Sequence, residues 1–129
     1  MNLSLLIGLV VFILILSGCT QNVGYGTLDG TITIGPLCPV EKNPPDPACK
    51  PTLETYASWP ISVWAPDGTQ IAQISPALNG SYSLKLTTGN YIIDLDNPAR
   101  LGQINLPKNI TISANATTIY DITIDTGIR

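Results

Sequence analysis

The chain of 129 residues contains no histidine, which removes the commonest general base at neutral pH and the commonest transition-metal ligand. Without such a base, nothing in the sequence activates one of the many serines and threonines as a nucleophile. Lysine and arginine total only six and are scattered, so no basic patch could neutralise a run of phosphates. We therefore expect no enzyme, no cofactor and no nucleic-acid partner.

Charged residues are also absent from the start of the chain, where residues 3–16 form an almost unbroken apolar run. At about 14 residues, the run fits a signal-peptide core better than the roughly 20 residues that span a bilayer. It ends at Leu16-Ser17-Gly18-Cys19, which resembles the lipobox of prokaryotic lipoproteins. This resemblance implies a signal peptide at residues 1–18 and lipid attachment at Cys19. The alternative is an uncleaved N-terminal membrane helix, and both interpretations place the rest of the chain outside the cytoplasm.

The cysteine count is consistent with that location. Of the three cysteines, lipidation of Cys19 would leave Cys38 and Cys49 as the only possible pair. A thiol metal site would need about four ligands, and two cysteines without histidine fall short of that number. We expect a disulfide bond between Cys38 and Cys49, as is common in exported proteins.

Beyond a short polar tether at residues 19–26, apolar and polar residues alternate in short segments, which is typical of strands with one buried face. Turn-forming residues such as Pro66-Asp67-Gly68 and Asn79-Gly80 separate them, and no helical period is apparent after Cys19. These features predict one all-β sandwich domain, residues 27–129, with about seven short strands. The predicted strands are residues 31–34, 61–65, 71–75, 82–86, 91–95, 103–106, 109–113 and 117–125.

Four stretches carry a family resemblance: GTITI from Gly30, PISVWAPDG from Pro60, NGSYSLKL from Asn79 and TGNYIIDL from Thr88. Their order resembles carboxypeptidase regulatory-like and transthyretin-like domains, which are similar to the B-type repeats of collagen adhesins. The resemblance implies a Greek-key β-sandwich and a non-catalytic module for surface display, spacing or binding. The lysine–asparagine isopeptide bond common in adhesin repeats is not implied, because residues 27–34 contain no lysine.

The segment 35–51 combines Cys38 and Cys49 with prolines at positions 36, 39, 44, 45, 47 and 51. Proline fixes φ and lowers the entropy of the unfolded loop, so the sequence predicts a rigid projection between the first two strands. A connection of this length is often functional, which favours a recognition loop. It could equally cover a sheet edge and block strand addition.

Tyr56, Trp59 and Trp64 form the other candidate binding surface, around the second strand. By alternation Trp64 points away from Ile61 and Val63, so its indole is predicted to stack on a sugar, anchor a protein partner or pack beneath a neighbouring loop. No metal site is expected. The oxygen ligands Asp94, Asp96 and Asn97 are fewer than the six to eight that calcium takes.

Three functional hypotheses follow from the sequence. The first is a lipid-anchored extracytoplasmic module with a structural or protein-interaction role at the cell envelope, held to the membrane through Cys19. The second is a carbohydrate-binding module that uses exposed aromatic residues to bind a polysaccharide. The third is a small protease inhibitor that presents the disulfide loop.

Overall fold

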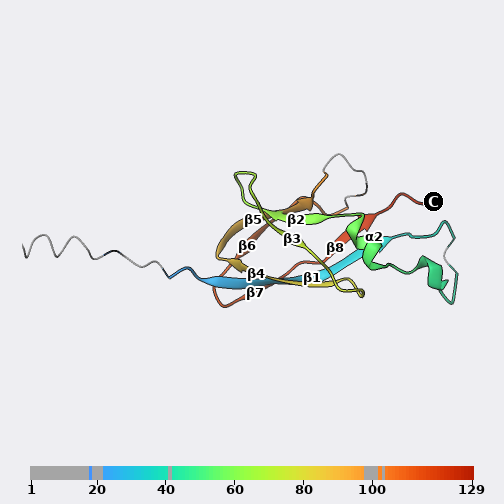
Figure 1. Ribbon diagram of the computed structural model, residues 1–129, viewed down its shortest axis with the longest axis horizontal. Helices are drawn as coiled ribbons and strands as arrows, with labels where there is room; N and C mark the ends of the chain where they lie inside the picture. The colour runs from blue at the N-terminus through green and yellow to red at the C-terminus, as the bar shows by residue number, and fades with distance from the viewer. Residues whose placement is uncertain (1–17, 19–21, 41, 98–101, 103) are drawn as a thin grey trace, which may run out of the picture.

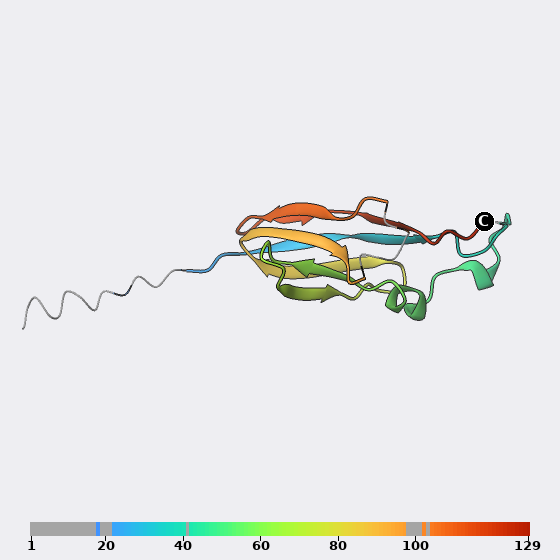
Figure 2. The ribbon, with the colours of Figure 1, turned by 90° about the horizontal axis from the view of Figure 1, so that it is seen from above.

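Two four-stranded sheets pack face to face in the computed structural model, which describes residues 18, 22–40, 42–97, 102 and 104–129 (Figures 1 and 2). The predicted all-β sandwich is therefore confirmed. The first sheet contains β1 (Tyr25–Gly35), β4 (Ser81–Thr87), β7 (Thr117–Ile119) and β8 (Ile122–Asp125). The second contains β2 (Ile61–Trp64), β3 (Gln70–Ile74), β5 (Gly89–Leu95) and β6 (Lys108–Ile112). A 3-10 turn, η1 (Pro47–Cys49), and a short helix, α2 (Leu53–Ala57), lie between β1 and β2.

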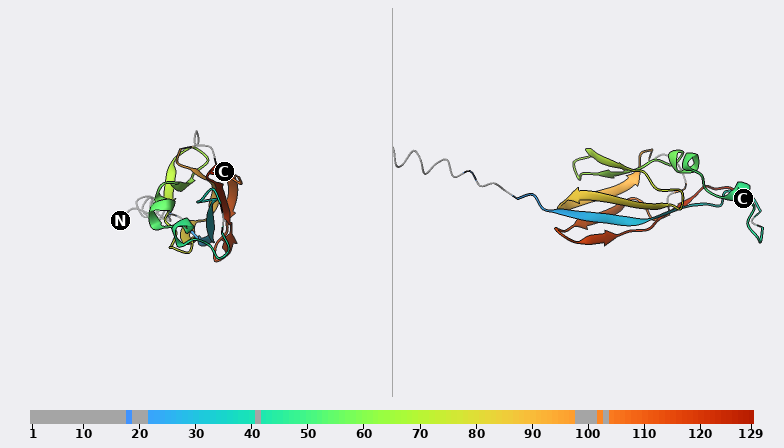
Figure 3. Two further views of the ribbon diagram at one scale, coloured as in Figure 1. Left: turned by 90° about the vertical axis from the view of Figure 1, so that its right-hand side faces the viewer. Right: turned by 60° about the horizontal axis from the view of Figure 1, so that its bottom comes forward.

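The long strand β1 runs the length of the sandwich and pairs with three others (Figure 3). Its first part pairs antiparallel with β4, from Tyr25 opposite Thr87 to Thr31 opposite Ser81. On its other edge β1 pairs in parallel first with β7 and then with β8. We call the end of the sandwich where β1 begins the entry end, and the end where β1 finishes the loop end.

The chain passes between the two sheets after β1, β3, β4 and β6, so most neighbouring strands are not consecutive in sequence. In the second sheet the order is β3-β2-β5-β6, which places β2 beside β5. Such crossings between sheets are typical of the Greek-key sandwiches that the family resemblance implies.

Alternating burial is clearest in β4 and β5, each of which turns one face toward the core. On β4, Tyr82 and Leu86 are buried and the residues between them are partly or fully exposed. On β5, Tyr91, Ile93 and Leu95 are buried, which confirms the predicted inward face. Burying a large aliphatic side chain contributes about 1.5–3 kcal/mol, so these two strands supply much of what holds the sheets together.

The strand predicted at 117–125 is interrupted between β7 and β8. A Cβ at Gly30 of β1 would lie 1.9 Å from the carbonyl oxygen of Tyr120, so the two backbones touch at this point. The Tyr120 amide still donates to the Asp29 carbonyl at 2.9 Å, but the Thr31 amide donates instead to the Asp121 carboxylate at 2.9 Å. A side chain therefore replaces one rung of the ladder, and eight strands result.

The strand predicted at 103–106 is wrong for the described residues 104–106, which form a bend beside β8. The Asn105 side chain donates to the Asp121 carbonyl at 2.9 Å and accepts from the Thr123 amide at 3.0 Å. This amide group imitates a peptide unit along the outer edge of β8, so the edge is occupied without a strand.

The N-terminal predictions lie mostly outside the described residues. The signal peptide at 1–18 and the lipid site Cys19 belong to this part, with Gly18 alone described. The predicted tether 19–26 overlaps β1, which already begins at Tyr25. Among the described residues, no helix has the length and apolar character needed to cross a membrane.

Candidate functional site

The disulfide loop, residues 35–51, projects from the loop end of the sandwich, opposite the entry of the chain (Figures 1 and 2). Its first residue, Gly35, is the last residue of β1, and its last residue, Pro51, lies two positions before the start of α2. The C-terminal residues lie at the same end of the molecule (Figure 1). The loop therefore stands at the tip of an elongated domain.

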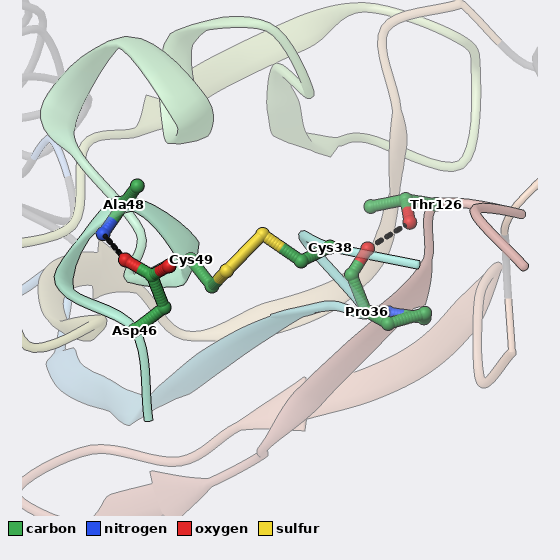
Figure 4. The surroundings of a disulfide bond; sticks show 6 residues. All are labelled: Pro36, Cys38, Asp46, Ala48, Cys49 and Thr126. Atoms are coloured by element: carbon green, nitrogen blue, oxygen red, sulfur yellow. Dashed lines mark hydrogen bonds between the residues drawn. A yellow bond between two sulfur atoms is a disulfide. The ribbon is translucent and has the colours of Figure 1, made fainter. Parts of the chain in front are cut away.

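The predicted Cys38–Cys49 disulfide is present, with Cα atoms 5.5 Å apart (Figure 4). Asp46 begins the 3-10 turn that carries Cys49. The Asp46 carboxylate accepts from the Ala48 amide at 2.9 Å and its carbonyl accepts from the Cys49 amide at 2.9 Å. Pro47 takes the first position of the turn, where its missing N–H costs nothing. A cap, a proline and a cross-link thus fix one arm of the loop.

The other arm is fixed by the C-terminal segment. The Thr126 hydroxyl donates to the Pro36 carbonyl (Figure 4), and the Thr126 amide donates to the Gly35 carbonyl at 3.2 Å. Asp125 forms an ion pair with Arg129 at 2.7 Å. The hydrogen bond from Arg129 is the main cause that lowers the pKa of Asp125.

The helix α2 closes the loop end. Thr52 accepts from the Thr55 amide at 3.2 Å and the Thr55 hydroxyl accepts from the Thr52 amide at 3.0 Å, which is a reciprocal cap. No helix was predicted here. The Thr-x-x-Thr spacing of Thr52 and Thr55, which allows a reciprocal cap, is the sequence signal for this short helix. Tyr56 faces inward from α2, and its hydroxyl donates to the Leu78 carbonyl at 3.3 Å.

The predicted aromatic surface is not formed. Tyr56 and Trp59 are only 7% and 8% exposed and belong to the core, so the expectation that they present a binding surface is wrong. Tyr56 lies on α2, and Trp59 follows the helix, with its amide donating to the Tyr56 carbonyl at 3.1 Å. Trp64 is half-buried and lies at the far end of β2, where it pairs with Ile92 and Gln70. It is therefore separated from the other two.

Two shallow clefts flank α2. One, of about 370 Å³, lies between the helix and the β3–β4 connection and is lined by Leu53, Tyr56 and Pro76 among others. The second, of about 430 Å³, lies between the helix and the C-terminal segment, with Leu37, Trp59 and Ile128 in its wall. Leu53 is 62% exposed at the rim of the first cleft. The loop end thus offers apolar surface beside a rigid projection.

The acidic residues predicted not to bind calcium are engaged in the fold. The Asp94 carboxylate accepts from the Leu95 amide at 2.8 Å, and Asp96 accepts from the Gln73 side chain at 3.1 Å. Across the described part of the chain, no three His, Cys, Asp or Glu side chains converge as metal ligands would.

Comparisons with known proteins give a fold likeness only. No family model and no curated protein matches the sequence. Among solved structures, the chain is similar to a DUF3823 family protein from Parabacteroides merdae, with 12% identity and a TM-score of 0.48 over 80% of this chain and 47% of that one. It is similar to GBS52, the minor pilin of Streptococcus agalactiae, with 14% identity and a TM-score of 0.49 over 80% and 45%.

A third similar structure is the TIE protein of Bacillus anthracis, with 12% identity and a TM-score of 0.47 over 79% of this chain and 16% of that one. The chain spans less than half the length of each of these three structures. Because the TM-scores are below 0.5, these similarities say nothing about function.

Proposed function

We propose that the chain is a lipid-anchored, non-catalytic module outside the cytoplasm, whose sandwich carries the disulfide loop away from the bilayer to bind another protein of the cell envelope. The lipid on Cys19 is the partner at one end, and the envelope protein is the partner at the other. The observation that carries this proposal is the position of the loop at the opposite end of β1 from the entry of the chain.

The geometry sets the distances. Tyr25 lies six positions after Cys19, so the entry end lies within about 20 Å of an anchored Cys19 at roughly 3.3 Å per residue. The eleven residues of β1 then extend over about 33 Å. The domain therefore acts as a spacer that holds the disulfide loop at a distance from the anchored Cys19, and it also presents that loop to a partner.

The surface of the loop favours a protein partner. Val40 is 69% exposed at its tip, and Pro44 and Pro45 are exposed nearby. A loop already fixed by a disulfide and prolines loses little entropy on binding, which raises affinity for a given contact area. The burial of Tyr56 and Trp59 leaves only Trp64, which is half-buried and separate from them, to support the carbohydrate-binding alternative.

The experiment that tests this function has two parts. Intact mass spectrometry of the protein purified from its membranes should show loss of residues 1–18 and added acyl mass on Cys19. A photo-reactive amino acid at Val40 should then cross-link to a discrete envelope protein in living cells. The matched control is the same amino acid at Ile119, which is 72% exposed on β7, away from the loop.

Cross-linking from Val40 should disappear in the double variant Cys38→Ser/Cys49→Ser, provided that circular dichroism shows an intact sandwich. Equal cross-linking from Val40 and Ile119, or cross-linking that ignores the disulfide, would remove the loop from the proposal. Unprocessed protein without acyl mass would remove the anchor.

A further inference from the structure

A shallow hollow of about 560 Å³ lies at the entry end, on the outer face of the first sheet. One side is the start of β1 with the residues just before it, and the other side is the turn between β6 and β7. Lys85 of β4 forms part of the wall. The polar groups that line it come from Thr27, Lys85, Asn115 and Thr117.

The hollow has the chemistry of an anion site. The Lys85 ammonium lies 4.8 Å from the centroid of the Tyr25 ring, which holds the charge beside the hollow. The amide of Asn115 and the hydroxyls of Thr27 and Thr117 are potential hydrogen-bond donors, and no carboxylate lines the hollow. Further up the same sheet Asp29 accepts from the Ser83 hydroxyl at 2.5 Å. A phosphate oxygen would therefore find donors and one cation here.

Apolar groups surround these donors. Val23 is 59% exposed and Tyr25 is 48% exposed, and both belong to the wall of the hollow. Tyrosine has an apolar ring and a polar hydroxyl, which suits it to the boundary between water and hydrocarbon. A donor-lined hollow with an apolar rim matches a phospholipid, whose phosphate lies directly above its glycerol and acyl chains.

We propose that this surface, which we call the entry face (Val23, Tyr25, Lys85, Asn115 and Thr117), lies on the phospholipid headgroups of the membrane that holds Cys19. The proposal rests on the lipid anchor of the proposed function. Val23 lies four positions after Cys19, a distance of at most about 14 Å when the chain is fully extended. This short tether keeps the entry face close to the headgroups. The bilayer is therefore the surface that the entry face contacts most readily.

Contact at the entry face orients the domain. With Val23, Tyr25 and the β6–β7 turn held at the headgroups, the disulfide loop lies at the end of β1 that is farther from Cys19. Anionic phospholipids should strengthen the contact, because Lys85 is the cation of the hollow.

The test uses the mature lipidated protein in liposomes and measures oxidation of individual side chains by hydroxyl radicals. Tyr25 reports the entry face, and Val40 at the loop end is the reference within the same molecule. Relative to detergent micelles, we expect anionic phosphatidylglycerol liposomes to protect Tyr25 and leave Val40 unchanged. A second form carries a flexible glycine–serine insertion after Gln21, so the short tether no longer holds the domain against the bilayer. Protection of Tyr25 that persists in this form reflects affinity of the entry face for the headgroups.

Charge variants complete the test. In the form with the inserted linker, Lys85→Gln should lower the ratio of docked to undocked entry face, read from the protection of Tyr25, about fivefold, the effect of one lysine near an anionic surface. The matched control is Lys108→Gln, since Lys108 also lies over a tyrosine ring, at 5.5 Å from the Tyr120 centroid, but does not line the hollow.

The outcomes separate the two proposals. Acylated protein whose Tyr25 is as reactive on liposomes as in micelles would overturn the entry-face proposal and leave the anchor standing. Equal effects of Lys85→Gln and Lys108→Gln would also overturn it. Absence of acyl mass on Cys19 would overturn both the anchor and the inference that depends on it.

Discussion

The two ends of the sandwich are built in different ways. At the entry end the strands are joined by tight connections: residues 65–69 between β2 and β3, Thr88 between β4 and β5, and residues 113–116 between β6 and β7. Backbone hydrogen bonds hold them, such as Ala65 to Thr69 at 2.8 Å and Asn115 to Tyr25 at 2.8 Å. At the loop end, the connection from β1 to β2 contains a disulfide, a capped turn and a capped helix.

The difference shows which connections are determined by their own local sequence and which need contacts with residues far away in the chain. A short turn satisfies its own backbone groups and adopts its shape with glycine or asparagine at positive φ, as at Gly68 and Asn115. A long connection cannot do this, so the loop end depends on a covalent bond and on side chains from distant elements. We expect substitutions at the loop end to act through packing and the cross-link, and those at the entry end to act through backbone geometry.

The largest effect should come from Trp59 at the loop end. Trp59→Ala removes a core ring that is 8% exposed, and we expect the free energy of unfolding to fall by about 3–5 kcal/mol. The control is Trp64→Ala, whose half-buried ring should cost less. Urea denaturation measures both. A smaller loss for Trp59→Ala than for Trp64→Ala would contradict the burial described here.

The disulfide should come next. The double variant Cys38→Ser/Cys49→Ser opens a loop with a sequence separation of 11, for which the chain-entropy model gives about 3 kcal/mol. Native-state hydrogen exchange should show increased opening around α2 and the C-terminal segment. Residues 113–116 at the entry end should exchange as before. An equal increase in the rate of hydrogen exchange at both ends would contradict the view that only the loop end depends on the disulfide.

A matched pair of glycines in β1 tests the entry end. A Cβ at Gly26 would lie 2.3 Å from the Ser113 carbonyl oxygen, whereas a Cβ at Gly35 would meet nothing within 4 Å. Gly26→Ala should therefore destabilise the protein by about 1–3 kcal/mol. Gly35→Ala should leave the thermal midpoint nearly unchanged. Similar thermal midpoints for the two variants would show that the backbone at the entry end can shift to accept a methyl group at Gly26.

The smallest effects should come from two exposed carboxylates, one at each end. Hydrogen bonds from Thr69 lower the pKa of Asp67, and the hydrogen bond from Arg129 is the main cause that lowers the pKa of Asp125. Because both values are lower in the folded state, their stabilisation is complete above the unfolded pKa and is lost as the pH falls through the folded value. Asp67→Asn and Asp125→Asn should each slightly flatten the acid limb of the stability curve, measured by thermal unfolding.

The same contrast explains how much the sequence could predict. Alternation in 82–86 and 91–95 identified β4 and β5 with their buried faces, because period-two burial is a local signal. The parity of the cysteines predicted the Cys38–Cys49 bond, since few pairings were possible. Both predictions depended on residues close together in the chain or on simple counting.

The errors arose where distant residues decide the structure. Residues 104–106 alternate like a strand, but their partner edge on β8 is occupied by the Asn105 side chain, and nothing local indicates this. Tyr56 and Trp59 were assigned to a surface because the five-residue α2 has too few turns for a helical period. The site was therefore predicted correctly for its cross-link and incorrectly for its aromatic residues.

The placement of β1 has a consequence for folding. It is the first strand of the domain to be synthesised, yet its last partner, β8, ends at Asp125. Such non-local pairing makes folding slow, and the unpaired edges of β1 can meanwhile be joined by other chains. Nearly the whole domain must be present before the first sheet can form, so a nonsense mutation ahead of β7 would leave a fragment in which β1 lacks two of its three partners.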